Sequence, residues 1–216
     1  MCCCVSCVSP VLFWEVNPMD KVDVCNMALS RIGIENIEVL TEASEPARVC
    51  SQFYDHCRRV VLRKYPWTWA TRRVQLAELT EKPQGFSYAY RYPSSCLALR
   101  KLYNACFDNI PAYTGYQIVS DTAGRVIYTN VSNVSAEYTA DIEDTRLFDE
   151  QFIEALSWKL AGAIAFRLTG NAQMPGYCEE QYMTLFLDAV ANNEDEQNAA
   201  EKEPYSLIAA RFGGDI

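Results

Sequence analysis

The chain has 216 residues, half of them apolar and 12% aromatic, a composition typical of a folded globular protein. Its formal net charge of −9 disfavours phosphate binding as the main role, because that binding depends on an excess of Lys and Arg. No apolar run approaches the roughly 18 residues that a membrane-spanning helix needs.

The first 18 residues are unlike the rest of the chain. They hold four of the ten cysteines: Cys2, Cys3, Cys4 and Cys7. Cys4 and Cys7 have the spacing of a zinc ligand pair, but no second pair follows, either further along or beside the only histidine, His56. We therefore interpret residues 1–18 as a leader outside the fold, with Met19 as a candidate initiator, and expect no metal or cofactor. The other six cysteines are expected to be reduced, buried thiols of a cytosolic product.

The first predicted helix runs through Arg31. Asp20 or Asp23 can accept hydrogen bonds from its first N–H groups, and Gly33 suits the left-handed position that stops a helix. Its apolar residues follow the spacing of one helix face: Cys25, Ala28, Leu29 and Ile32.

A second, longer helix is predicted after a short link. Ser44 is a favourable N-cap, Pro46 is tolerated in the first turn, and Pro66 ends the helix because it disfavours helical geometry at the residue before it. The predicted apolar face consists of Cys50, Phe53, Tyr54, Cys57, Val60, Val61 and Tyr65.

Between residues 86 and 142 the pattern changes to short runs rich in β-branched and aromatic residues. Strands are predicted within residues 86–92, 96–103, 116–130 and 134–142, and residues 121–124 form the turn of a hairpin. The run lacks the helices that a parallel sheet needs between its strands. One antiparallel sheet is therefore expected over residues 83–148.

Helical patterns return after this segment. Asp149 is a predicted N-cap, with Phe148 and Ile153 spaced as a hydrophobic staple, and Gly170 ends that helix. The expected core stripe is Phe152, Leu156, Leu160, Ala163, Ile164 and Leu168. A fourth helix starts near Pro175 and continues as an acidic extension.

The complete pattern predicts an α+β fold. Residues 19–203 are expected to form a single domain, in which a helical bundle from residues 20–82 and 149–203 carries the inserted antiparallel sheet. Pro204 breaks the last helix, and residues 204–216 are expected to form an extended C-terminal arm. The arm offers four apolar side chains for binding a partner: Tyr205, Leu207, Ile208 and Phe212.

Three aromatic residues surround the proline that ends the second helix. One interpretation is a nucleic-acid groove in which Trp67 and Trp69 stack on bases while Arg72 and Arg73 hold phosphates. The other is a structural motif, Pro66 with the two tryptophans, that fills the core where helix becomes extended chain. The acidic composition favours the second interpretation.

Charge is unevenly distributed along the chain. Residues 47–75 hold seven basic side chains and one acid, whereas residues 178–203 hold eight acids and one lysine. Such asymmetry favours contact between complementary surfaces, within the molecule or between copies. Five arginines are candidates for a subunit interface: Arg58, Arg59, Arg63, Arg72 and Arg73.

Four motifs follow one another in a distinctive order. They are ALSRIG (residues 28–33), VCSQFYDHCRRVVLRKYPWTWATRRVQLA (49–77), YAYRYPSSCLALRKL (88–102) and EALSWKLAGAIAFRLTG (154–170). In this order they resemble the head-to-tail adaptor family of short-tailed phages, which includes tail tubular protein A and the tail accessory, or head completion, proteins. The resemblance covers nearly all of residues 19–203. The arginine-rich helix running into Pro66-Trp67 and the Tyr-x-Tyr-x-Tyr-Pro strand are its most specific parts.

The resemblance implies a structural virion protein rather than an enzyme. Twelve copies would form a ring beneath the portal protein, extend the DNA channel and present a platform for the next tail component, a nozzle or tail tubular protein B-like protein. Genomic DNA would pass through the lumen without sequence-specific binding, and a negative lumen would help it slide. The location implied is the head–tail junction of the virion, and the host cytoplasm during assembly.

Two other functions remain open from the sequence. A virion-associated peptidoglycan hydrolase would need a pair of carboxylates, one with a raised pKa. The candidates are Asp141, Glu143, Asp144, Asp149 and Glu150, although their position before a helix also suits solvent-exposed and capping roles. A DNA-terminus-binding protein is the third possibility.

Overall fold

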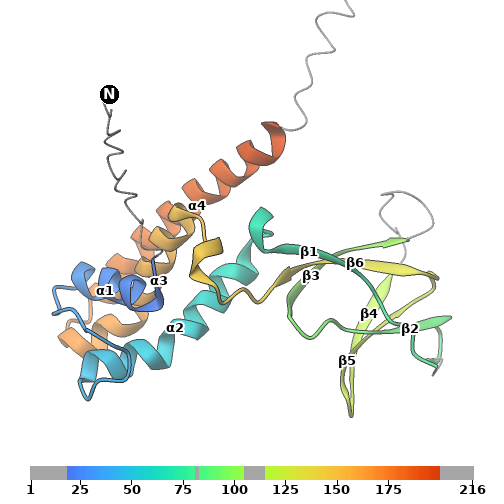
Figure 1. Cartoon of the computed structure of the whole chain (residues 1–216), viewed down its shortest axis with the longest axis horizontal. Coiled ribbons are helices and arrows are strands. Elements are labelled where there is room, and N and C mark those ends of the chain that lie inside the picture. The colour runs from blue at the N-terminus through green and yellow to red at the C-terminus, as the bar shows by residue number, and fades with distance from the viewer. Residues whose placement is uncertain (1–18, 81–82, 105–114, 200–216) are drawn as a thin grey trace, which may run out of the picture.

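A computed structural model of the chain describes residues 19–80, 83–104 and 115–199, with side chains described as far as residue 196. The helices are α1 (Lys21–Arg31), α2 (Glu45–Lys64), α3 (Glu150–Thr169) and α4 (Met174–Ala199), with short 3-10 turns η1 (Thr68–Ala70) and η2 (Thr145–Leu147). The strands are β1 (Thr71–Gln75), β2 (Tyr88–Arg91), β3 (Cys96–Asn104), β4 (Tyr116–Asp121), β5 (Gly124–Thr129) and β6 (Val134–Ala140). The fold is α+β, as predicted, with helices at both ends of the chain and strands between them (Figure 1).

The ends of the first two helices follow the predicted capping chemistry. Asp20 and Asp23 both take part, since the side chain of each accepts a hydrogen bond of 2.9 Å from the backbone N–H of the other. Ser44 Oγ accepts a hydrogen bond from Ala47 N, and Gly33 has the left-handed φ of +73° that few other residues adopt.

Helix α3 packs against α1, α2 and α4, so it is buried on several sides (Figure 1). At Gly162 the approach to α4 is so close that an added Cβ would lie 3.4 Å from Cys178 Cβ. The expected stripe on α3 is too narrow: Ala163 is exposed, whereas Ala161 and Ala165 are fully buried. A helix with three neighbours buries more than one face.

The strands form two sheets rather than the single sheet expected from the sequence. The first has the order β1-β6-β3 and the second β2-β5-β4, and all pairs are antiparallel. Residues just after β1 connect them, because Leu79 N donates to Ala89 O at 2.8 Å and Arg91 N donates to Ala77 O at 3.0 Å. The chain therefore leaves one sheet and pairs with the next within a few residues.

Strand β1 corrects the predicted boundary of the helical region, which had extended over residues 20–82. Thr71 to Gln75 pair with β6, so the β structure begins about a dozen residues earlier than residue 83. The pairing partners lie 60 to 68 positions further along the chain, and no local periodicity signals the pairing. The hairpin β4–β5 is as predicted, with Asp121 opposite Gly124.

Helix α3 begins and ends close to the predicted residues, and α4 begins at Met174, next to the predicted start at Pro175. Asp149 Oδ1 accepts from Gln151 N at 2.6 Å, and Gly170, with φ +69°, donates from its N–H to Phe166 O at 2.9 Å. None of the helices that the structure describes is long and apolar enough to cross a membrane. The leader, Cys106 and the arm residues Tyr205, Leu207, Ile208 and Phe212 lie outside the described residues.

The buried apolar residues of the described chain form two clusters. The larger one is built by the four helices with Trp67, and the smaller one lies among the strands. Ile142, between β6 and η2, packs against both clusters. This connection, together with the chain from α2 into β1, links the helices to the sheets.

The helix–sheet junction and the charged surfaces

Trp67 lies in the interior at the end of α2. Its side chain is 1% exposed, and Nε1 donates a hydrogen bond to Val61 O at 3.3 Å. Its ring meets Phe152 of α3 and Phe186 of α4 edge-on, with centroids 5.3 and 5.9 Å away. A base cannot stack on an indole that is covered in this way, so the structure supports the interpretation of Trp67 as part of the core.

Trp69 extends the same aromatic cluster towards the start of α3. Its ring lies 4.9 Å from that of Phe152 and 5.3 Å from that of Phe148. Pro66 performs its predicted role, because Tyr65 before it is extended, with φ −137° and ψ 149°. The three motif residues therefore lie together and direct the chain from α2 into β1.

Asn193 of α4 closes the junction from the other side. It is 3% exposed; its Oδ1 accepts from Thr68 N at 3.3 Å and its Nδ2 donates to Thr68 Oγ1 at 2.7 Å. The sequence had placed this residue in a polar extension. The apolar positions Tyr182, Phe186 and Ala189 on the same helix face continue to Asn193, and this periodicity was the available signal.

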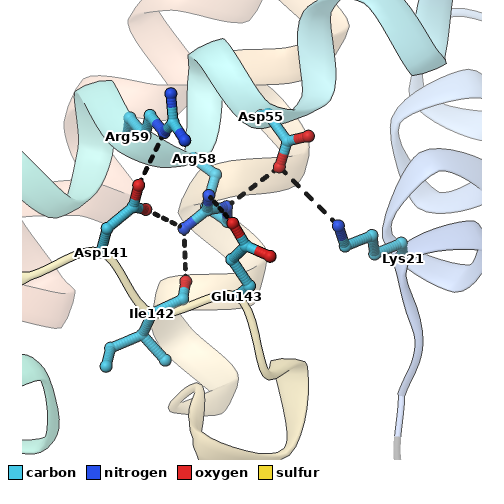
Figure 2. Close-up of polar contacts among 7 residues, drawn as sticks. All are labelled: Lys21, Asp55, Arg58, Arg59, Asp141, Ile142 and Glu143. Atoms are coloured by element: carbon cyan, nitrogen blue, oxygen red, sulfur yellow. Dashed lines mark hydrogen bonds and ion pairs between the residues drawn. The ribbon is translucent and has the colours of Figure 1, made fainter. Parts of the chain in front are cut away.

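Arg58 is fully buried and lies at the centre of a charged network between α2 and the segment after β6 (Figure 2). Its Nη1 donates to Asp141 Oδ1 at 2.6 Å and also to the carbonyl oxygen of Ile142. Its Nε donates to Asp55 Oδ1 at 3.3 Å, and Nη2 lies 3.9 Å from Glu143 Oε1. A buried guanidinium requires such partners because an unpaired charge in the interior is costly.

Asp141 also forms an ion pair with a second arginine. Arg59 Nε lies 2.8 Å from Asp141 Oδ2, so one carboxylate connects two consecutive residues of α2 (Figure 2). On the outer side, Lys21 Nζ lies 3.8 Å from Asp55 Oδ1, which joins α1 to the network. The network thus ties three parts of the chain together where the two cores meet.

The five arginines proposed for a subunit interface therefore separate into different classes. The prediction that Arg58 lies at a subunit interface is wrong, because a side chain without exposed surface cannot contact a neighbouring copy. Arg59 and Arg73 are exposed and each holds a carboxylate of its own chain, Asp141 and Glu137. Arg63 and Arg72 are exposed and form no ion pair in the described part of the chain, although Arg72 Nη1 donates to backbone carbonyls.

Four of the five candidate catalytic acids have structural contacts. Asp141 and Glu143 face Arg58, Asp149 caps α3, and Asp144 accepts from Arg146 N at 3.1 Å at the start of η2. The Arg146 guanidinium and backbone N–H lower the pKa of Asp144, which is the opposite of what a general acid needs. The fifth, Glu150, is exposed.

A groove with a positive rim runs beside β1. It has a volume of about 840 Å³ and lies between β1, the β2–β3 connection and the β4–β5 turn. Three arginines line it, Arg63, Arg91 and Arg125, and no carboxylate does. Arg100 lies next to them; burial and the neighbouring charge of Arg63 lower its pKa. Arg125 was not predicted as a site residue, because it lies outside the arginine-rich segment and only the β4–β5 hairpin brings it to this groove.

A second hollow, of about 710 Å³, lies between the start of α3 and the distal half of α4 and has the opposite charge. Four carboxylates line it with no basic residue: Asp149, Glu150, Asp195 and Glu196. Phe148, Gln151 and Asn192 complete the lining. Positive and negative side chains are therefore separated in space as well as along the sequence, into the groove beside β1 and the hollow at α3 and α4.

The five cysteines in the described residues are buried, free thiols, as predicted. Burial raises the pKa of the Cys57 thiol to about 11, so it stays protonated at neutral pH. Within the described chain, no three His, Cys, Asp or Glu side chains gather as metal ligands. The remaining cysteines, including Cys4 and Cys7, lie outside the described residues.

Comparisons with protein-family models and with curated proteins find no match to this chain.

Proposed function

We propose that this protein is a structural component of a phage virion, a head-to-tail adaptor whose copies form a ring under the portal protein. The ring has twelve members, extends the DNA channel and provides the attachment platform for the tail. The proposal rests first on the order of the four sequence motifs, which resemble that family over residues 19–203.

One structural observation carries the proposal further. One of the two most specific parts of the resemblance, the arginine-rich helix running into Pro66-Trp67, ends where the chain passes from α2 to β1, with Trp67 1% exposed. The residues behind the resemblance are thus those that determine how one part of the subunit is held on the other. A subunit of a multi-component tail needs such a rigid connection, since its two parts face different neighbours.

The contacts of the charged residues also support a structural role. Arg58, Asp141 and Asp55 are engaged with one another and hold the chain together. Trp67, the best candidate for base stacking, is covered by protein. These contacts account for the conspicuous aromatic and acidic residues without a catalytic or DNA-reading role.

In this proposal, residues 204–216 form the arm that contacts the portal. Their apolar side chains Tyr205, Ile208 and Phe212 recur at helix-like spacing, which suits an apolar groove on a partner. DNA passes through the lumen without sequence-specific contacts.

The test is electron microscopy of the purified protein mixed with the portal protein of the same virus. We expect a ring stacked on one face of each portal, and a monomer or small oligomer when the portal is absent. Portals that stay bare at saturating protein concentration would contradict the adaptor function. Stable dodecamers of the protein alone would contradict only the need for a portal template.

A further inference from the structure

The positive groove beside β1 has charges that the described chain leaves unneutralised. Arg63 and Arg125 are exposed and neither forms an ion pair with a carboxylate in the residues that the structure describes. Only Arg91, the third arginine of the lining, is paired, with Asp121 at 3.2 Å. Arg125 instead lies over the ring of Tyr92, 5.5 Å from its centroid.

The groove also has apolar surface. Val74 of β1, which is 41% exposed, lies in its lining together with Leu97. Unpaired positive charge beside apolar surface suits a protein surface that presents carboxylates next to an apolar residue, because complementary charges orient a partner while apolar contact supplies binding energy.

The acidic hollow at α3 and α4 has that composition. Asp195 and Glu196 are exposed, and neither has an ion-pair partner in the described chain. The lining includes the apolar side chain of Phe148, and Leu147, which precedes it in the sequence, is 47% exposed. The hollow and the groove share no lining residue, so they are two different surfaces of the molecule.

We propose that the positive groove of one copy, around Arg63, Val74 and Arg125, receives the acidic surface of the next copy, around Glu150, Asp195 and Glu196. The occupant of the groove is thus a second copy of this chain. Two different surfaces that bind each other form a head-to-tail contact, which repeats around an axis and closes into a ring when the rotation permits. The inference rests on the proposed ring and names the surfaces that would build it.

The contact is tested in solution without the portal, by sedimentation velocity of the full chain in reducing buffer at low salt. We expect weak self-association that decreases as salt rises from about 50 to 500 mM, since exposed charges are screened over that range. The groove variant R63E/R125E and the helix variant D195K/E196K should each weaken self-association at least about tenfold.

The four-fold variant R63E/R125E/D195K/E196K provides the decisive comparison. It restores opposite charges across the contact, so its association constant should return to within about threefold of the wild-type value. Recovery of this kind cannot arise from misfolding of either double variant. Circular dichroism and melting temperature verify that all variants fold.

R48E/R167E is the matched control. It reverses two exposed arginines that lie beside Glu45, and Arg48 is fifteen residues from Arg63 on α2, about 22 Å along the helix. Self-association of this control should equal that of the wild type.

Unchanged association in the groove or helix variant, failure of the four-fold variant to recover, or no wild-type self-association at about 1 mM would each overturn the inference. The portal experiment remains separate: a ring on the portal that tolerates both double variants would retain the adaptor function and reject only this interface.

Discussion

Trp67 and Arg58 are two large, buried side chains near the junction of the helices and the sheets, and they stabilise the fold by different physical means. The indole fills space between Phe152 and Phe186, so its contribution comes from apolar area removed from water. The guanidinium is held by charge and hydrogen bonds, whose gain is offset by the cost of removing the charge from water.

Replacing Trp67 by alanine should lower the free energy of unfolding by about 3–5 kcal/mol, because it leaves a cavity in the larger core. Urea unfolding followed by circular dichroism measures this loss. Phe166→Ala is the matched control: Phe166 is 60% exposed, and its removal should change stability by less than about 1 kcal/mol. Similar losses in both variants would show that Trp67 has no special place in the core.

Arg58→Met should destabilise the protein by about 3 kcal/mol or more. The substitution removes one of the two arginines that neutralise Asp141, whose side chain is only 18% exposed. Arg59→Ala, at 53% exposure, should cost less than about 1 kcal/mol. The double variant R58M/D141L should regain part of the loss, because it removes both charges together. A double variant less stable than Arg58→Met would contradict this account.

Because burial raises the pKa of the Cys57 thiol, we expect the protein to lose stability in alkaline solution. Its pKa is 9.0 in its ordinary state and about 11 in the folded protein, mainly because burial disfavours the thiolate. Between these pH values the unfolded chain releases the proton and the folded chain keeps it, so stability falls as pH rises, by about 2–3 kcal/mol in total. The stabilisation that the protonated Cys57 thiol gives to the folded state is fully present below pH 9 and is lost as the pH rises to 11.

Cys57→Ala lacks this loss. The difference in unfolding free energy between wild type and variant should therefore narrow as pH rises from 8 to 11, measured by urea unfolding with reductant present. A constant difference would mean that the thiol ionises equally in both states.

Among the elements, α3 has the most central position, since it packs against each of the other three helices. Its start depends on Asp149, whose Oδ1 accepts from Gln151 N at 2.6 Å, and its end on the left-handed Gly170. Asp149 and Glu150, at the N-terminus of α3, also provide two of the carboxylates of the acidic hollow. The N-terminus of α3 therefore contributes both to the core and to the charged surface.

Asp149→Ala should lower stability by about 1 kcal/mol, because a backbone N–H in the first turn of α3 loses its acceptor. Asp149→Asn retains a side-chain oxygen and should lose only a few tenths of that amount. Thermal unfolding of the two variants under identical conditions compares them. Equal losses would show that the negative charge, rather than the hydrogen bond, stabilises this helix end.

Some of the strands could be predicted from the sequence and others could not. Hairpin β4–β5 was predictable because its two strands are joined by a turn, with Gly124 at φ +128°. Strand β1 was not, because Thr71 to Gln75 become a strand only by pairing with the distant β6. For the same reason the division into two sheets was missed: the change of partner after β1 depends on contacts remote in sequence.

At the scale of the whole molecule, the buried residues of the described chain lie between Val24 and Asn193. The helical cluster and the strand cluster are connected through Ile142, whose carbonyl oxygen accepts a hydrogen bond from Arg58. The arm, residues 204–216, follows the last of these buried positions. The arm lies outside the described residues, and we retain for it the proposed role of binding the portal protein.

Deletion of residues 205–216 should leave the melting temperature nearly unchanged and abolish ring formation on the portal. Differential scanning calorimetry and electron microscopy of the portal mixture measure the two effects. A full-length chain in which Tyr205, Ile208 and Phe212 are replaced by serine should behave like the deletion. Full docking of the shortened chain would contradict the role of the arm.

The sequence by itself determined the features that depend on neighbouring residues. These include the helix ends at Asp20, Ser44 and Asp149, the stop at Pro66, the hairpin, and the preference of Trp67 for a core, because caps, turns and periodicity act over a few positions.

Only the tertiary structure decided which arginines are available to a partner. Arg58 and Arg59 are adjacent in sequence, yet one is fully buried and the other is 53% exposed. Arg125, far from the arginine-rich segment, joins Arg63 in one groove. Burial and charge pairing depend on the position of every other element, and that position follows from long-range packing rather than from local sequence.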